Sequence, residues 1–171
     1  QHFGVEPDII VLGKSLGGGM IPLAGIISRD AYNTCGTTAL GHYTHEKSPL
    51  GATAGLATLE VIRREGLLQR SKELGRLLLD QVRELRERHP VIREVRGLGL
   101  LVGIELTDPH EGQKAGDLAE LVMLECQRLG LSFKIGKGNV IVLAPPLTIR
   151  KDQLLEAIRL LDEALSSASR S

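Results

Sequence analysis

The stretch VLGKSLGGG, residues 11–19, raises the first question about this chain. The apolar run at residues 9–12 is typical of a buried strand, and it ends at Gly13-Lys14-Ser15, with three glycines shortly after. A lysine followed by a serine in a glycine-rich turn can grip the phosphates of a nucleotide, or it can present its amine for covalent chemistry. The two interpretations lead to different enzymes.

The position of the glycines excludes the phosphate-gripping loop. Such a loop needs a glycine five positions before the glycine-lysine pair, so that successive backbone N–H groups curl around the phosphates. That position holds Asp8, whose carboxylate would repel a triphosphate, and the neighbouring Pro7 has no N–H to donate. The glycines of this chain also follow the lysine instead of preceding it.

A covalent role for Lys14 requires its amine to lose a proton. A free lysine side chain has a pKa of about 10.4, and desolvation or a nearby positive charge lowers that pKa and frees the amine as a nucleophile. The glycines at 17–19 would leave room for a cofactor against the backbone. A solvent-exposed turn lysine followed by a flexible glycine hairpin has the same pattern, so the local sequence leaves both interpretations open.

The composition excludes several classes of protein. The 171 residues are enough for one ordinary domain with a core, and Lys+Arg and Asp+Glu both number 21, which leaves no net charge to attract nucleic acid or an anionic membrane. No apolar run approaches about 18 residues, so the sequence predicts no membrane span. Cys35 and Cys126 are too few and too far apart for a disulfide framework, and a reducing, cytoplasmic location is the simplest expectation.

The apolar periodicity changes near residues 66–90, which divides the chain into two expected parts, residues 1–66 and residues 67–171. The first part is predicted to contain a strand, a glycine turn and a strand over residues 8–28, then a loop over 34–48 and a helix from Pro49. The elements expected in the second part are helices at 67–88, 115–129 and 151–165, strands at 91–96, 100–106, 131–135 and 140–143, and a frayed tail from Ser166.

Two patterns locate the core of the second part. The strands at 91–96 and 100–106 are separated by Gly97 and Gly99, which predicts an antiparallel pair around a glycine turn. The last helix is amphipathic. Its side chains expected to point inward are Leu154, Leu155, Ile158, Leu161 and Leu165.

The segment PDIIVLGKSLGGGMIPLAGIISRDAYN, residues 7–33, closely resembles the signature of the class III aminotransferases, which are pyridoxal-phosphate enzymes of fold type I. Three later segments resemble the family in the same order, and they are residues 43–62, 92–106 and 139–149. The resemblance implies an α/β fold of the fold type I PLP-dependent transferase kind. Within that fold, residues 1–66 would be the C-terminal part of the large cofactor domain with a connecting helix, and residues 67–171 the small α+β C-terminal domain.

The resemblance also implies the site. Lys14 would carry pyridoxal 5'-phosphate as an internal aldimine and then act as the general base, in a reaction between a small-molecule amino donor and a 2-oxo acid acceptor. Thr44 aligns with a threonine that reaches the cofactor phosphate of the partner subunit, which implies a homodimer. A loop threonine that bonds its own backbone is the simpler alternative for Thr44.

Two departures from the family pattern bear on the reaction. His45-Glu46-Lys47-Ser48 follows Thr44 where many members have Phe-Gly-Gly-Asn, and Val142 stands where many members have an arginine that pairs with a substrate carboxylate. The loss of that arginine favours an amine, an ω-amino acid or a phosphorylated amino substrate. A PLP-dependent racemase or epimerase, an aminomutase, or an ammonia- or phospho-lyase of the same family therefore stays open beside transamination, because all begin with the same loss of a proton from Cα.

Two further expectations concern metals and completeness. His42 and His45 lie near Glu46 in a loop, but no convincing third ligand accompanies them, so we expect no metal site. Family members are considerably longer than this chain, so the resemblance implies a C-terminal portion that has little or no turnover by itself. A non-catalytic fragment that folds as a small α+β domain is the third functional class.

Overall fold

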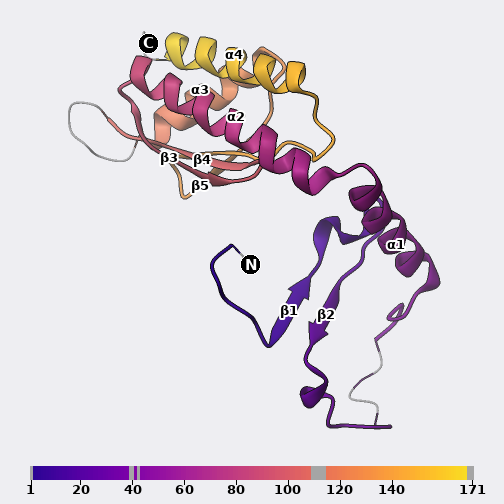
Figure 1. The fold of residues 1–171 in the computed structure, drawn as a ribbon. Coiled ribbons are helices and arrows are strands. Elements are labelled where there is room, and N and C mark those ends of the chain that lie inside the picture. The colour runs from indigo at the N-terminus through magenta and orange to yellow at the C-terminus, as the bar shows by residue number, and fades with distance from the viewer. Residues whose placement is uncertain (1, 39–40, 42, 109–114, 169–171) are drawn as a thin grey trace. The chain divides into compact units, whose positions relative to one another are not determined.

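The computed structural model describes residues 2–38, 41, 43–108 and 115–168, and the chain separates into two compact units, residues 1–65 and residues 66–171 (Figure 1). Both units combine helices with antiparallel strands. In the described part of the chain, no helix has the length and apolar character that crossing a membrane requires.

The N-terminal unit is built on an antiparallel hairpin. Strand β1 (Ile9–Leu12) pairs with β2 (Gly25–Ser28) in a register that places Ile9 opposite Ser28 and Leu12 opposite Gly25. The short 3-10 turn η1 (Lys14–Gly17) follows β1, and a second 3-10 turn, η2 (Asp30–Tyr32), follows β2. The strands are as expected from the sequence, although their apolar side chains are exposed on both faces: Val11 is 75% and Ile26 is 70% exposed.

Helix α1 (Pro49–Arg64) packs through glycines instead of leucines. It begins at the proline, as predicted, and Gly51 and Gly55 are its two buried residues. A Cβ atom placed at Gly55 would lie 2.6 Å from Leu23 Cδ2, and one at Gly51 would lie 3.3 Å from Leu23 Cδ1. The glycines therefore let the Leu23 side chain lie directly on the helix backbone.

The C-terminal unit has a four-stranded antiparallel sheet with helices on one side (Figure 1). The order across the sheet is β3-β4-β6-β5. The strands are β3 (Ile92–Leu98), β4 (Leu101–Leu106), β5 (Lys134–Gly136) and β6 (Val140–Leu143), and the helices are α2 (Leu67–Arg88), α3 (Gly116–Arg128) and α4 (Lys151–Ala168).

Strand β5 begins later than the sequence suggested. The expected strand at 131–135 starts only at Lys134, because the Leu131 N–H donates to the Cys126 carbonyl at 2.8 Å and closes the end of α3. Gly130, with a φ of +92°, makes this closure possible.

The core lies between the sheet and the helices. Side chains alternate along β4, where Val102, Ile104 and Leu106 are buried and Leu101 is 59% exposed. Helix α4 contributes the stripe that was expected, with one exception. Leu155 is 37% exposed, because the buried positions follow a spacing of three and four residues that runs beside it: Leu154, Ile158, Leu161 and Leu165.

The end of α4 also differs from the expectation of a frayed tail. The helix continues through Ala168, and residues 166–168 are partly buried. Ala164 and Leu165 are fully buried just before them, so the helix is still packed on the core where the sequence pattern had ended.

The β3–β4 turn is tighter than predicted. Gly97 lies inside β3, not in the turn, and a Cβ atom there would approach the Leu101 carbonyl oxygen to 2.5 Å. The turn itself uses Gly99, whose φ is +55°. Gly75 of α2 lies against it, since a Cβ atom at Gly75 would overlap the backbone of Gly99. Helix and hairpin therefore touch backbone to backbone at this point.

A polar contact joins the end of α2 to α4. His89 caps α2 and is buried, and its Nε2 lies 2.6 Å from Asp162 Oδ1 on α4. Arg88 donates to the other carboxylate oxygen of Asp162. Partial burial acts to raise the pKa of Asp162, but the hydrogen bonds from His89 and Arg88 outweigh it and hold that pKa below its ordinary value of 3.8.

Asp162→Asn is expected to lower the free energy of unfolding by about 1–2 kcal/mol at pH 7, because His89 then faces a neutral amide in a buried position. A carboxyl whose pKa is lower in the folded state stabilises the fold above its unfolded pKa and loses that contribution as pH falls through the folded pKa. The difference in the free energy of unfolding between the unsubstituted protein and Asp162→Asn should therefore shrink below about pH 4. Denaturant unfolding at pH 7 and pH 3 checks this, and a difference that stays constant would contradict it.

Candidate active site

Lys14 lies at the first position of the turn η1, immediately after β1 and Gly13. Its backbone φ is +52°, in the left-handed region that non-glycine residues avoid at a cost of about 1–3 kcal/mol. The side chain is exposed, and within the described residues it takes part in no hydrogen bond or ion pair. Strained backbone of this kind is concentrated at functional sites.

The glycines after Lys14 have separate roles. Gly18 has a φ of +71° and donates its N–H to the Ser15 carbonyl at 3.0 Å, which closes the turn. A Cβ atom on Gly18 would lie 3.0 Å from Oγ1 of Thr58, which itself donates to the Ala54 carbonyl of α1 at 2.8 Å. Gly19, with a φ of +76°, has nothing within 4 Å of its Cβ position. The turn is thus held against α1 while space remains open beside it.

Asp8, which excluded the phosphate-gripping loop, has a structural partner. Arg29 Nε lies 3.1 Å from Asp8 Oδ1, and the Arg29 backbone N–H donates to the Asp8 carbonyl at 3.2 Å. Both residues are more than half exposed, so the ion pair contributes little stability on its own. Its place is at the open end of the hairpin, at the opposite end of β1 from Lys14.

Thr44 lies in an exposed run of turns that leads into α1. The Glu46 N–H donates to the Tyr43 carbonyl at 3.1 Å, and His45 and Lys47 both have positive φ, 68° and 60°. Within the described residues the Thr44 side chain has no hydrogen-bond partner, and no bond joins it to Lys14. Within one chain, the described residues therefore show no hydrogen bond between the two predicted site residues.

The residues considered as metal ligands give no cluster. His45 and Glu46 are exposed, and His42 lies outside the described residues. Among the residues that the structure describes, no three His, Cys, Asp or Glu side chains are grouped so that they could hold a metal ion.

The two cysteines differ in environment. Cys35 is exposed and Cys126 is fully buried in the core of the C-terminal unit. Burial, with a smaller effect of the neighbouring Glu125 carboxylate, raises the pKa of the Cys126 thiol to about 12. Cys126 is therefore a protonated, unreactive core residue.

Val142 lies in β6, half-buried, between Gly103 of β4 and Lys134 of β5 in the sheet register. Arg96 occupies the β3 position opposite Gly103, and its Nη1 is 3.0 Å from Glu105 Oε2 and 3.1 Å from Glu94 Oε2. Sequence reasoning singled out Val142 but missed Lys134, which the register alone reveals as its cross-strand neighbour.

Known proteins resemble this chain over nearly its whole length. The sequence profile of the family described as aminotransferase class-III matches residues 1–165. The chain is 46% identical over 167 residues to the (R)-1-hydroxy-2-aminoethylphosphonate ammonia-lyase of Vibrio splendidus, a match covering 97% of this chain and 35% of that protein. It is 36% identical over 168 residues to the leucine/methionine racemase of Thermococcus litoralis, covering 97% and 38%.

A solved structure agrees with these matches. The acetylornithine aminotransferase from Elizabethkingia anophelis superposes with a TM-score of 0.87 at 32% identity, over 97% of this chain and 42% of that one. The chain thus spans between 35% and 42% of the length of these three proteins. Their names describe an ammonia-lyase, a racemase and an aminotransferase, so the shared fold does not by itself decide the reaction.

Proposed function

The chain belongs to the class III aminotransferase family, whose members depend on pyridoxal 5'-phosphate, and we propose that Lys14 is the residue that attaches this cofactor. The residues present fit the group. The amine of Lys14 is exposed and without a partner in the described residues, and the open space beside Gly19 leaves room against the backbone. When bound, the cofactor would supply an electron-withdrawing ring that weakens bonds at the substrate carbon next to nitrogen.

Lys14 would also move a proton. Once the substrate amine has displaced it, Lys14 Nζ is the base that takes the proton from the carbon carrying the substrate nitrogen. The turn η1 favours this role, because it packs against α1, where a Cβ atom on Gly18 would lie 3.0 Å from Thr58 Oγ1. A fixed backbone returns the amine to the same place at each turnover.

Thr44 would serve the cofactor of a second subunit. Its hydroxyl is exposed and unbonded in the described residues, so it is available to donate to a phosphate oxygen. This assignment makes the enzyme a homodimer and explains why the structure does not join Thr44 to Lys14 within one chain.

The reaction we propose is release of ammonia from a small amine that bears a hydroxyl on the neighbouring carbon and an anionic group such as a phosphonate. The proton leaves the carbon that carries nitrogen, the hydroxyl leaves as water, and water then replaces the nitrogen as ammonia departs, so an aldehyde forms with no oxidant. One observation carries this proposal: the ammonia-lyase of Vibrio splendidus is 46% identical over 97% of this chain, against 36% for the racemase. Val142 supports it, because an apolar side chain at this half-buried position offers no partner to the carboxylate of an ordinary α-amino acid.

Transfer of the amino group to a 2-oxo acid is the second candidate, favoured by the 32% identity to the acetylornithine aminotransferase. Both reactions begin when Lys14 removes the same proton. They differ in whether the nitrogen leaves as ammonia or is kept and handed to the acceptor, so the acceptor requirement separates them.

The test uses the enzyme that contains this chain, loaded with pyridoxal 5'-phosphate, and (R)-1-hydroxy-2-aminoethylphosphonate as the probe. We expect free ammonia to appear without any 2-oxo acid, measured by the indophenol colour reaction on stopped samples, and the rate to stay unchanged when pyruvate is added. Turnover that needs pyruvate and produces alanine would instead establish the aminotransferase. Loss of optical rotation of leucine without ammonia would establish a racemase.

A further inference from the structure

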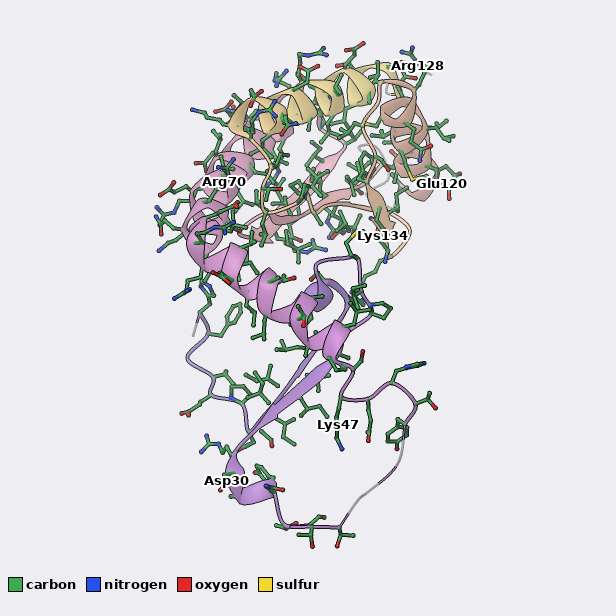
Figure 2. The ribbon with its side chains drawn as sticks, turned by 90° about the vertical axis from the view of Figure 1, so that its right-hand side faces the viewer. Asp30, Lys47, Arg70, Glu120, Arg128 and Lys134 are labelled. Atoms are coloured by element: carbon green, nitrogen blue, oxygen red, sulfur yellow. The ribbon has the colours of Figure 1, made fainter. Side chains whose placement is uncertain are left out.

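The sheet of the C-terminal unit has an outer face, which points away from the helices. Gly103 belongs to it, because it alternates along β4 with the buried residues Val102 and Ile104. The sheet register continues this face as one row across the four strands, in the order Arg96, Gly103, Val142 and Lys134. Figure 2 shows Lys134 on the side of this unit opposite α4.

Contacts at two glycines agree with this row. A Cβ atom at Gly136 would lie 3.4 Å from Val142 Cγ2, so the Val142 side chain lies on the face to which Gly136 points. Lys134 is two residues before Gly136 on β5 and points to the same face, directly beside Val142. A Cβ atom at Gly103 would lie 3.9 Å from Arg96 Cγ. Because neither glycine has a side chain, room for a small molecule remains next to Val142.

The two cations at the ends of the row differ in whether their charge is offset. Arg96 Nη1 lies 3.0 Å from Glu105 Oε2 and 3.1 Å from Glu94 Oε2, so two carboxylates neutralise it. Lys134 is exposed, and within the described residues its ammonium has no ion pair or hydrogen bond. The charge that this row offers to an anion beside Val142 is therefore that of Lys134.

We propose that Lys134 binds the phosphonate of the substrate and thereby selects amines that carry such a group. This inference rests on the proposed function, in which Val142 faces a substrate with an anionic group. A compact ammonium can serve any of the three oxygens of a phosphonate, whereas a planar carboxylate is best matched by the two-pronged guanidinium of an arginine. The carbon chain of the substrate would then lie on Val142.

Titration calorimetry with ethylphosphonate measures this binding without any reaction, because the probe has no amine. The enzyme that contains this chain is first loaded with pyridoxal 5'-phosphate, so that the cofactor already occupies the site for its own phosphate. We expect Lys134→Met to weaken ethylphosphonate binding about tenfold, the size of one hydrogen bond between charged groups, and Lys134→Arg to restore most of it. Lys137→Met, at an exposed lysine in the turn after β5, should leave the binding unchanged. Equal binding by the unsubstituted enzyme and Lys134→Met, or no saturable binding by the unsubstituted enzyme, overturns the proposal.

Steady-state kinetics distinguish a binding role of Lys134 from a structural one. With (R)-1-hydroxy-2-aminoethylphosphonate, Lys134→Met should raise KM about tenfold and leave kcat within about twofold, because the lysine holds the anionic group and takes no part in the proton transfer at Lys14. A fall in kcat with an unchanged KM overturns the proposal.

The anion site and the proposed reaction fail in different ways. If no ammonia is released but ethylphosphonate binding depends on Lys134, the reaction is wrong and the anion site stands. If ammonia is released and KM is the same in Lys134→Met, the reaction stands and the anion site is wrong. Lys134 would then serve only to block pairing of the edge strand β5 with another chain.

Discussion

Replacing Lys14 with glycine is expected to abolish turnover and to raise the stability of the folded protein at the same time. Turnover should fall by at least about 10³-fold, because the variant loses both the amine that attaches the cofactor and the base that moves the proton. The free energy of unfolding should rise by about 1 kcal/mol, because glycine adopts the φ of +52° without the strain that a lysine carries there. If Lys14 had no role beyond its place in the turn, Lys14→Gly would raise the stability without lowering the turnover.

Lys137→Gly is the matched control. Lys137 is an exposed lysine with a φ of +53°, in the turn between β5 and β6, so the same substitution removes the same kind of strain. The free energy of unfolding of Lys137→Gly should rise by a similar amount, while its turnover stays at the level of the unsubstituted enzyme. Borohydride reduction of the loaded enzyme, followed by peptide mapping, should place the cofactor on the peptide that contains Lys14. A cofactor adduct on another lysine, or normal turnover by Lys14→Gly, would contradict the assignment.

Gly75→Ala is expected to lower the free energy of unfolding by about 3 kcal/mol or more. The added methyl group would occupy the position of the Gly99 backbone, and neither helix α2 nor the β3–β4 turn offers a flexible side chain that could move aside. Helix propensity alone predicts the opposite sign, since alanine is favoured over glycine by about 1 kcal/mol inside a helix. The direction of the effect therefore distinguishes packing from propensity.

Thermal and urea unfolding of Gly75→Ala measure this effect, with Arg76→Ala as the control on the same helix. Arg76 is exposed, so its replacement should change stability by less than about 0.5 kcal/mol. A higher melting temperature for Gly75→Ala would mean that α2 and the turn can separate without cost, and the backbone contact described above would not hold the unit together.

Much of the fold could be predicted, because periodicity and chain breakers act locally. Pro49 begins α1, Gly66 separates α1 from α2, and the apolar stripe of α4 identifies the core. Close approaches between distant segments could not be predicted. In the sequence, Gly75 is an unfavourable residue inside a helix, and only the structure shows that Gly99 packs against it. Leu155 is as apolar as its neighbour Leu154, and only the packing of the helix on the sheet decides which of the two is buried.

The residues of the candidate site were harder to predict from the local sequence than the helices and strands. The spacing of the glycines excluded a nucleotide-binding loop at Lys14. The choice between a solvated turn and a covalent anchor came from the resemblance of several motifs, in order along the chain, to the class III aminotransferases. The backbone strain at Lys14 leaves no trace in a one-dimensional pattern, because any lysine in a glycine-rich turn would look the same. Lys134 was missed for a similar reason, since its place beside Val142 depends on a pairing between two strands.

The exposed hairpin of the N-terminal unit has a consequence for anyone who produces this chain in quantity. Strands β1 and β2 present uncharged, β-branched side chains on both faces, including Ile9, Val11, Ile26 and Ile27. Short segments of this composition are those from which ordered aggregates nucleate when copies meet. We therefore expect these eight strand residues to determine the protein concentration, salt and temperature at which the chain stays free of aggregates during purification.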